Sequence, residues 1–175
     1  MKRLLLIVLP LLLIVGCSKP ISEDTLLDKN GLKFHPETKE LYSGEVFQIR
    51  MGGGKDFEGS YKDGYKDGLF TYWYEDGQKK EEVTYKDGKK DGVGIFWYRN
   101  GQKKEELTIK DGNLDGPSTF WYENGQKKVE VTFKNNKLDG FGTSWYENGQ
   151  KEGETTYKDG ELKSYKGWEE DGSPK

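Results

Sequence analysis

Side chains that usually carry out catalysis are scarce in this 175-residue chain, which has one cysteine, Cys17, and one histidine, His35. A zinc site, a Cys–His pair and a Ser–His–Asp triad each need more of these residues than the chain offers. Asp87-Gly88 and Asp91-Gly92 suggest calcium, but calcium takes roughly six to eight oxygen ligands in one place, and turn chemistry explains these pairs. The sequence therefore predicts a protein that is not an enzyme and that holds no metal or other cofactor.

Cys17 follows a segment with the features of an export signal. Lys2 and Arg3 precede an apolar run from residue 4 to residue 15, interrupted only by Pro10. A bilayer span needs about 20 apolar residues, so this run has the length of a signal-peptide core rather than of a membrane helix. Residues 1–16 are therefore predicted to be a signal peptide.

The string Ile14-Val15-Gly16-Cys17 resembles the bacterial lipobox. The resemblance implies cleavage before Cys17, a diacylglycerol thioether on its sulfur and acylation of the new amine. Two or more acyl chains would anchor the protein stably to a bacterial membrane, facing the periplasm or the cell exterior. Ser18 stands where Asp usually retains a lipoprotein in the inner membrane, so the outer membrane is expected in a Gram-negative cell. Residues 17–30 are expected to be the lipidated cysteine and a polar tether.

A regular aromatic ladder is the other candidate functional feature. Its members recur every 24 residues: Trp73, Tyr74, Trp97, Tyr98, Trp121, Tyr122, Trp145 and Tyr146. Two interpretations are open: the ladder packs the fold, or it is a stacking surface for sugar rings or for the apolar side chains of a partner. The net charge is −3 and lysines alternate with acidic residues, so no basic stripe suggests nucleic-acid binding.

Turn signals recur with the same period as the aromatic ladder. Asn-Gly and Asp-Gly favour type I′ turns, and they follow the two halves of the units, as at Asn100-Gly101 and Asp111-Gly112. One unit has Asn135-Asn136 in place of Asp-Gly, and asparagine also tolerates positive φ. Between turns the pattern alternates, with Val83 and Tyr85 on one face of the segment 80–85. A period of two between turns indicates β-hairpins.

The repeats predict an all-β fold: a single-layer, elongated antiparallel sheet of stacked hairpins with a 24-residue period. A lone hairpin is marginal in water, so neighbouring hairpins must pair edge to edge. The repeat domain is predicted over residues 31–175, with units starting near 44, 68, 92, 116 and 140 and a partial last unit. Its ends depart from the pattern, because Ile49 stands where Trp is expected and Trp168 comes one residue early.

The units resemble the bacterial variant of the MORN repeat (membrane occupation and recognition nexus). Gly92-Val93-Gly94, Gly140-Phe141-Gly142 and the Trp-Tyr-Glu-Asn-Gly strings at 121–125 and 145–149 carry the resemblance. It implies a repeat sheet without catalytic residues. Members of the family are often labelled antitoxins of toxin–antitoxin systems, and others are described as membrane-associated or protein-binding scaffolds.

Three functions remain open on the sequence. The first is a lipid-anchored scaffold that binds another envelope or extracellular protein. The second is an antitoxin or immunity-type protein. The third is a carbohydrate-binding module for cell-wall glycan, with the aromatic ladder as its platform.

Overall fold

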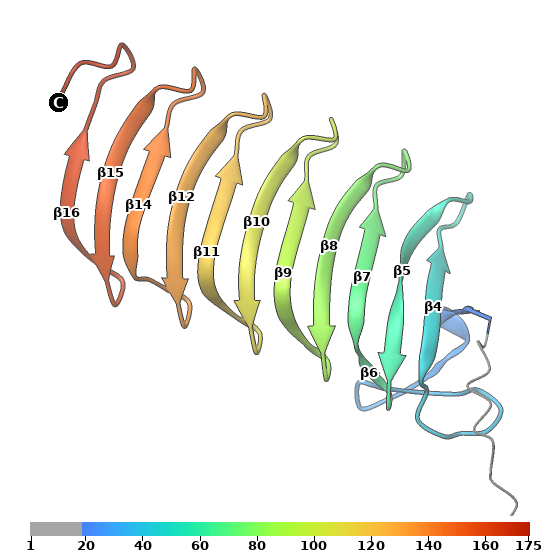
Figure 1. The fold of residues 1–175 in the computed structure, drawn as a ribbon. Helices are drawn as coiled ribbons and strands as arrows, with labels where there is room; N and C mark the ends of the chain where they lie inside the picture. Colours follow the sequence, from blue (N-terminus) through green and yellow to red (C-terminus); the bar gives the residue numbers. More distant parts are fainter. Residues whose placement is uncertain (1–18) are drawn as a thin grey trace, which may run out of the picture.

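The computed structural model describes residues 19–175, which form one long sheet and contain no α-helix (Figure 1). The strands, in order across the sheet, are β1 (Ile21–Ser22), β4 (Gly44–Ile49), β5 (Lys55–Lys62), β7 (Gly68–Trp73), β8 (Lys79–Lys86), β9 (Lys89–Trp97), β10 (Lys103–Lys110), β11 (Asn113–Trp121), β12 (Lys127–Lys134), β14 (Gly140–Trp145), β15 (Lys151–Lys158) and β16 (Glu161–Gly167). Two short strands extend this path, β6 (Tyr65–Lys66) beside β5 and β13 (Lys137–Leu138) beside β12. All pairs are antiparallel except β1 with β4.

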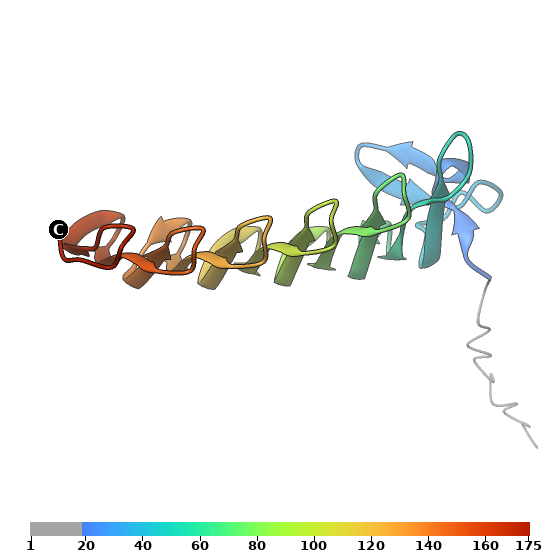
Figure 2. The ribbon, with the colours of Figure 1, turned by 90° about the horizontal axis from the view of Figure 1, so that it is seen from above.

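The sheet confirms the predicted architecture of stacked hairpins. It is a single layer, and successive hairpins lie side by side along one axis (Figure 2). Eleven long strands, β4 to β16 on the main path, span roughly 50 Å at about 4.8 Å per strand. No helix among residues 19–175 is long and apolar enough to cross a membrane.

The Asp-Gly turns form as predicted. Asp87 and Gly88 both have positive φ, 48° and 81°, as a type I′ turn requires. Asn135 and Asn136 take the same conformation in the unit that lacks glycine there, with φ of 48° and 63°. Asn tolerates this region better than most residues, so the turn persists.

The Asn-Gly turns at the other end of the hairpins differ from the prediction. Only the glycine has positive φ there, for example 82° at Gly101. The Gly101 amide donates to the Tyr98 carbonyl at 3.0 Å, and the Tyr98 amide donates to the Gln102 carbonyl at 2.9 Å. The loop is therefore longer than two residues and is built on an i to i+3 turn that ends in a left-handed glycine.

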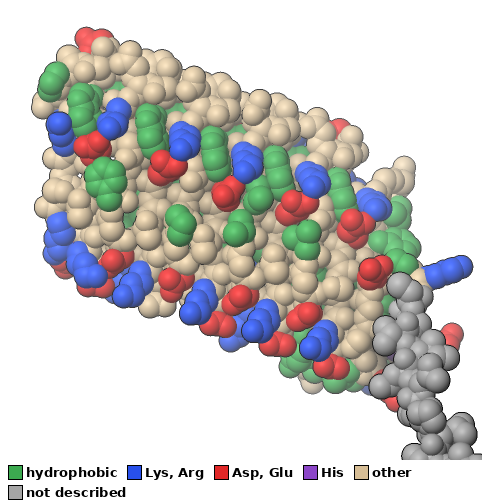
Figure 3. Space-filling view, viewed as in Figure 1, with side chains coloured by type: hydrophobic (Ala, Val, Ile, Leu, Met, Phe, Trp, Pro, Cys, Tyr) green, Lys and Arg blue, Asp and Glu red, His purple; other side chains and the backbone are tan. Residues whose placement is uncertain are grey.

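Alternation along the strands gives the sheet two different faces. We call the side with Trp73, Trp97, Trp121 and Trp145 the tryptophan face; it is the side seen in Figure 3. The opposite side holds Phe70 and Val83, which pair across β7 and β8 and are 0% and 1% exposed. We call it the apolar face.

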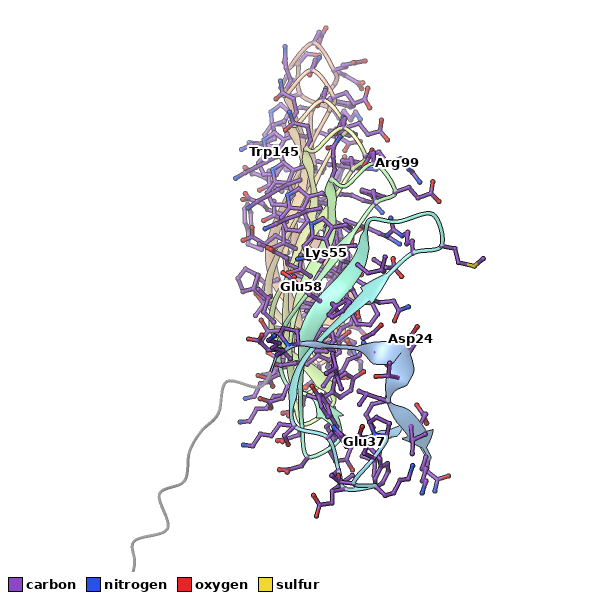
Figure 4. All side chains as sticks on the ribbon, turned by 90° about the vertical axis from the view of Figure 1, so that its right-hand side faces the viewer. Asp24, Glu37, Lys55, Glu58, Arg99 and Trp145 are labelled. Atoms are coloured by element: carbon purple, nitrogen blue, oxygen red, sulfur yellow. The ribbon has the colours of Figure 1, made fainter. Side chains whose placement is uncertain are left out.

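The N-terminal segment covers one end of the apolar face. It consists of β1, a 3-10 turn (Glu23–Thr25) and a small hairpin, β2 (Leu27–Lys29) with β3 (Leu32–Phe34). Leu26 and Tyr42 are buried against Val46, Tyr61 and Phe70, and the segment lies on the side away from Trp145 (Figure 4).

This cover corrects the predicted tether. The chain from Ile21 onward belongs to the folded domain, whereas the sequence placed a polar tether as far as residue 30. Ile21 and Leu26 are apolar and complete a core that the first two hairpins leave open. The sequence conceals this role because residues 17–30 are hydrophilic on average. Cys17 and residues 1–16 lie outside the described residues.

Candidate binding surfaces

The tyrosines of the aromatic ladder connect each repeat to the next. The Tyr74 hydroxyl donates to the Trp97 carbonyl at 2.7 Å. The same bond recurs at 2.8 to 2.9 Å in the following units: Tyr98 to Trp121, Tyr122 to Trp145 and Tyr146 to Trp168. Burial raises the pKa of Tyr98 and Tyr122. These hydroxyls are engaged within the fold, which favours a structural role for this half of the ladder.

Arg50 takes the place of the ladder tyrosine in the first unit. It stands 24 residues before Tyr74, and its guanidinium donates to the Trp73 carbonyl while pairing with Asp56 at 2.6 Å. Sequence inspection missed this residue because arginine does not resemble tyrosine. The 24-residue spacing combined with the shared acceptor is the signal that identifies it.

A lysine lies over each tryptophan ring on the tryptophan face. The ammonium of one hairpin sits 5.2 to 5.8 Å from the ring centroid of the next: Lys55 over Trp73, Lys79 over Trp97, Lys103 over Trp121, Lys127 over Trp145 and Lys151 over Trp168. Each lysine also pairs with the glutamate three residues later, as Lys103 does with Glu106 at 2.6 Å. Figure 3 shows these side chains as a regular row of apolar, basic and acidic groups.

This arrangement bears on the stacking interpretation of the ladder. The tryptophans are half-buried, and each ring already has a cation–π partner on one side. A sugar ring stacking on that side would have to displace the lysine and its glutamate. Trp168 completes the row although it comes one residue early, because Tyr146 still bonds to its carbonyl at 2.9 Å.

The asparagine loops add a second row of bonds between repeats. The Asn124 side-chain oxygen accepts from the Gln126 amide at 2.9 Å, and its amide group donates to the Glu147 carbonyl at 2.8 Å. Asn100 and Asn148 repeat both bonds. Asp76 keeps only the first of them, to Gln78, because a carboxylate cannot donate.

The first half of the apolar face, from β4 to β10, is closed by its own side chains. Phe70 is fully buried, and the ammonium of Lys66 lies 4.6 Å from its ring centroid. One unit later Lys90 lies 5.7 Å from the Phe96 centroid and pairs with Glu81 at 3.2 Å. Charged groups therefore overlie the aromatic rings of this half.

The second half of the apolar face, from β11 to β16, lacks both the overlying lysines and the large buried ring. At the repeat position that Lys66 and Lys90 occupy, the later units have leucine, at Leu114, Leu138 and Leu162. The repeat position of Phe70 is already a glycine at Gly94 on β9, and in the second half it holds Ser118 and Gly142. A hollow of about 490 Å³ results over β11 to β15, with Phe120, Val129, Val131, Phe133, Leu138 and Tyr157 among its lining residues.

The remaining candidate residues, His35 and the aspartates of the turns, make contacts that stabilise loops and turns. His35 accepts the backbone amides of Glu37 and Thr38 at 3.2 and 3.4 Å, which closes an exposed loop. Within residues 19–175, His, Cys, Asp and Glu side chains nowhere form a group of three that could hold a metal ion. Asp91 accepts the Asp111 backbone amide at 3.1 Å, so its carboxylate links two hairpin turns.

Comparison with known proteins gives the family. Four segments of 22 residues match the MORN repeat variant: residues 66–87, 90–111, 114–135 and 138–159. A search among curated proteins finds no match. The segments coincide with the hairpins that carry the tyrosine and asparagine bonds, and together they make up just over half of the chain. The chain therefore belongs to the MORN repeat variant family, whose repeats suggest a binding scaffold.

Proposed function

We propose that this protein is a non-enzymatic, lipid-anchored scaffold that binds another protein at the cell envelope through the second half of its apolar face. The hollow over β11 to β15 is the observation that carries the proposal. It is lined mainly by aliphatic and aromatic side chains, together with Lys128 and a few small polar residues, and leucine replaces the lysines that overlie aromatic rings in the first half. Such surfaces suit apolar side chains of a partner.

The covered end of the same face supports this choice. There the chain places its own Leu26 and Tyr42 on Val46, Tyr61 and Phe70 and buries them. The uncovered end presents the same kind of side chains, including Phe120 and Val131, without such a cover among the described residues. A partner segment that carries apolar side chains would complete the second half as residues 21–42 complete the first.

The ladder gives less support to a glycan platform. Its tyrosine hydroxyls donate within the sheet, and its tryptophan rings carry lysines. A glycan platform would need free ring faces and free polar groups beside them. The protein-binding proposal needs neither, because it uses the opposite face.

The anchor belongs to the proposal and rests on the lipobox. Cys17 precedes the first described residue, Lys19, by two positions, and β1 follows at the β4 end of the sheet. A lipid on Cys17 would hold that end near the membrane and place the hollow farther away. Replacing Cys17 by alanine should move the folded protein from the detergent phase to the aqueous phase in a partition assay. A variant that still partitions into detergent would refute the lipid anchor.

Site-specific photo-crosslinking in intact cells tests protein binding with a matched pair of positions. Thr155 lines the hollow on the apolar face, whereas its neighbour Thr156 pairs with Phe141 on the other face. We expect a photoreactive residue at 155, but not at 156, to give one reproducible crosslinked protein. Equal products from both positions, or none from 155, would contradict the proposal. Glycan fragments in place of a protein would favour a carbohydrate-binding module.

A further inference from the structure

The two ends of the sheet are not equivalent. At one end β1 pairs with the middle of β4, at Val46 and Phe47, and the N-terminal segment covers the adjacent face. At the other end β16 pairs with β15, and among residues 19–175 its outer side is bonded only at its last residue, where the Gly167 carbonyl accepts the Lys175 amide at 3.0 Å (Figure 1). The backbone of residues 161–166 has no strand on that side and can accept one.

The side chains of β16 are unusually open for a strand of this sheet. Its first six residues are all exposed, and Leu162 and Tyr165 are 53% and 57% exposed. Both pair with residues of the apolar face, Leu162 with Tyr157 and Tyr165 with Thr155. Those two partners line the hollow, so the exposed pair continues the apolar surface to the edge of the molecule.

The sequence of β16 is complementary to itself in one antiparallel register. Placing Leu162 opposite Tyr165 of another β16 also places Glu161 opposite Lys166, and each of these pairings occurs twice. Opposite charges and aromatic–aliphatic contacts at directly opposed positions are the pairs that stabilise antiparallel strands. The pairing of β16 with β15 shifts register between Leu162 and Ser164, with Lys163 as the extra residue, so Leu162 and Tyr165 share the apolar face although they are three residues apart. Glu161 and Lys166 share the other face.

We propose that the protein forms a two-fold dimer in which the β16 strands of two copies pair antiparallel in this register. The two-fold axis of an antiparallel strand pair is perpendicular to the sheet, so the apolar faces of both copies point the same way. The two hollows then lie on either side of the axis in one continuous sheet, with the N-terminal segments at its two far ends. The assembly closes at two copies, because β1 blocks the β4 edge from joining a β16 edge.

Lysines on an edge strand commonly prevent such pairing, and β16 has two of them. Lys163 is already paired with Glu161 at 2.6 Å within its own strand. Lys166 faces Glu161 of the other copy in this register, so its charge favours that register over those that place it near another lysine. Lys163 lies opposite Ser164 of the other copy, so this register places no lysine directly opposite another lysine.

Cysteine crosslinking on the full chain tests the register. In a Leu162→Cys, Tyr165→Cys variant each new thiol lies opposite its counterpart in the other copy, within the reach of a disulfide. We expect mild oxidation to give a covalent dimer whose bridges join position 162 to position 165, as identified by mass spectrometry. A Leu162→Cys, Ser164→Cys variant, whose two positions are not opposed, should give roughly fivefold less covalent dimer, because its thiols do not meet the geometry of a disulfide. Equal yields from both variants, or bridges between other positions, would overturn the proposal.

Sedimentation velocity of the full chain in density-matched detergent tests the dimer itself. Leu162→Ser should raise the dimer dissociation constant by roughly tenfold or more, because both copies lose the apolar contact. Leu69→Ser is the matched control: Leu69 is also 53% exposed but lies on β7, far from the edge, and its variant should sediment as the unaltered protein does. Circular dichroism verifies that both variants fold. A monomer at every concentration, or equal effects of the two substitutions, would refute the dimer.

Discussion

At the residue scale, the repeats are held together by side chains that bond to the backbone of the next unit. A tyrosine hydroxyl and an asparagine amide each bond to a carbonyl one unit away, as Tyr122 does to Trp145 and Asn124 to Glu147. A single-layer sheet has little interior, so such bonds carry a larger share of its stability than they would in a thick core. Arg50 shows that a different donor can meet the same need.

Removal of one ladder hydroxyl should weaken the sheet measurably. Tyr122→Phe keeps the ring but loses the donor to the Trp145 carbonyl, so we expect the free energy of unfolding to fall by about 0.5–1.5 kcal/mol. Tyr165→Phe is the control, since its hydroxyl donates to no described residue and its side chain is exposed. Urea unfolding followed by tryptophan fluorescence measures both. Equal stabilities for the two variants would show that the ladder bond contributes nothing.

The tyrosines of the apolar face should make stability fall in alkaline solution. Burial raises the pKa of Tyr72 and Tyr85 in the folded protein above the ordinary value of about 10. The unfolded chain then loses these protons at lower pH than the folded one, so stability is intact below pH ~10 and is lost as pH rises through the folded pKa values.

Two measurements check the alkaline behaviour together. Ultraviolet titration should show a group of tyrosines that ionise only above the ordinary pKa, and circular dichroism should show unfolding over the same pH range. Ionisation of every tyrosine at the ordinary pKa while the sheet remains folded would contradict the prediction.

At the element scale, each hairpin has two differently built ends. The Asp-Gly end uses two residues with positive φ, and its glycine amide bonds to the preceding unit, as Gly112 does to the Lys90 carbonyl at 2.8 Å. The Asn-Gly end uses a longer loop and bonds to the following unit. Both ends are therefore linked to neighbours, in opposite directions along the sheet.

Two glycine substitutions separate backbone strain from packing. Gly112 has φ of 86° and open space where a Cβ would lie, so Gly112→Ala should cost about 1–2 kcal/mol through strain alone. Gly94 lies in ordinary extended backbone, and a Cβ there would meet Ile109, Phe96 and Val83 at 3.4 Å. Gly94→Ala should therefore cost less than Gly112→Ala. Thermal unfolding of both variants gives the comparison, and the reverse order would show that packing on the apolar face dominates.

At the scale of the whole molecule, the repeat sheet is uniform in backbone but graded in surface. Its β4 end is capped by the N-terminal segment, and the apolar face changes from charge-covered rings to an open hollow toward β16. In a linear array each unit contacts only its neighbours, so a destabilising substitution at one end should affect only the adjacent units.

Removal of the cap should loosen one end of the sheet only. Leu26 is 7% exposed in the core cluster with Val46 and Phe70, so Leu26→Ala should cost about 2–4 kcal/mol locally. We expect faster hydrogen exchange in β4 to β7 and unchanged exchange in β14 to β16, because stability in such arrays is carried by adjacent units. Leu162→Ala should leave β4 to β7 unchanged. Uniformly faster exchange after the Leu26 change would show that the sheet opens as one cooperative unit.

The sequence by itself determined the hairpins, their period and their order. Val83 and Tyr85 alternate with polar residues, and Asp87-Gly88 requires positive φ, so both features depend on nearest neighbours alone. The 24-residue repeat then leaves one way to stack the units, since each hairpin needs a partner on both edges. Local chemistry and repetition together suffice for this part of the fold.

Only the tertiary structure decided what each recurring side chain does. The Tyr98 hydroxyl meets a carbonyl 23 residues away, and Lys79 lies over the ring of the following hairpin, because stacking brings these atoms together and spacing alone does not name the partner. The fold of residues 21–42 onto the apolar face was likewise invisible, since Leu26 finds its core through long-range contacts. The hollow arises from slots such as Ser118 and Leu138, whose common face becomes apparent only when strands from several units are aligned.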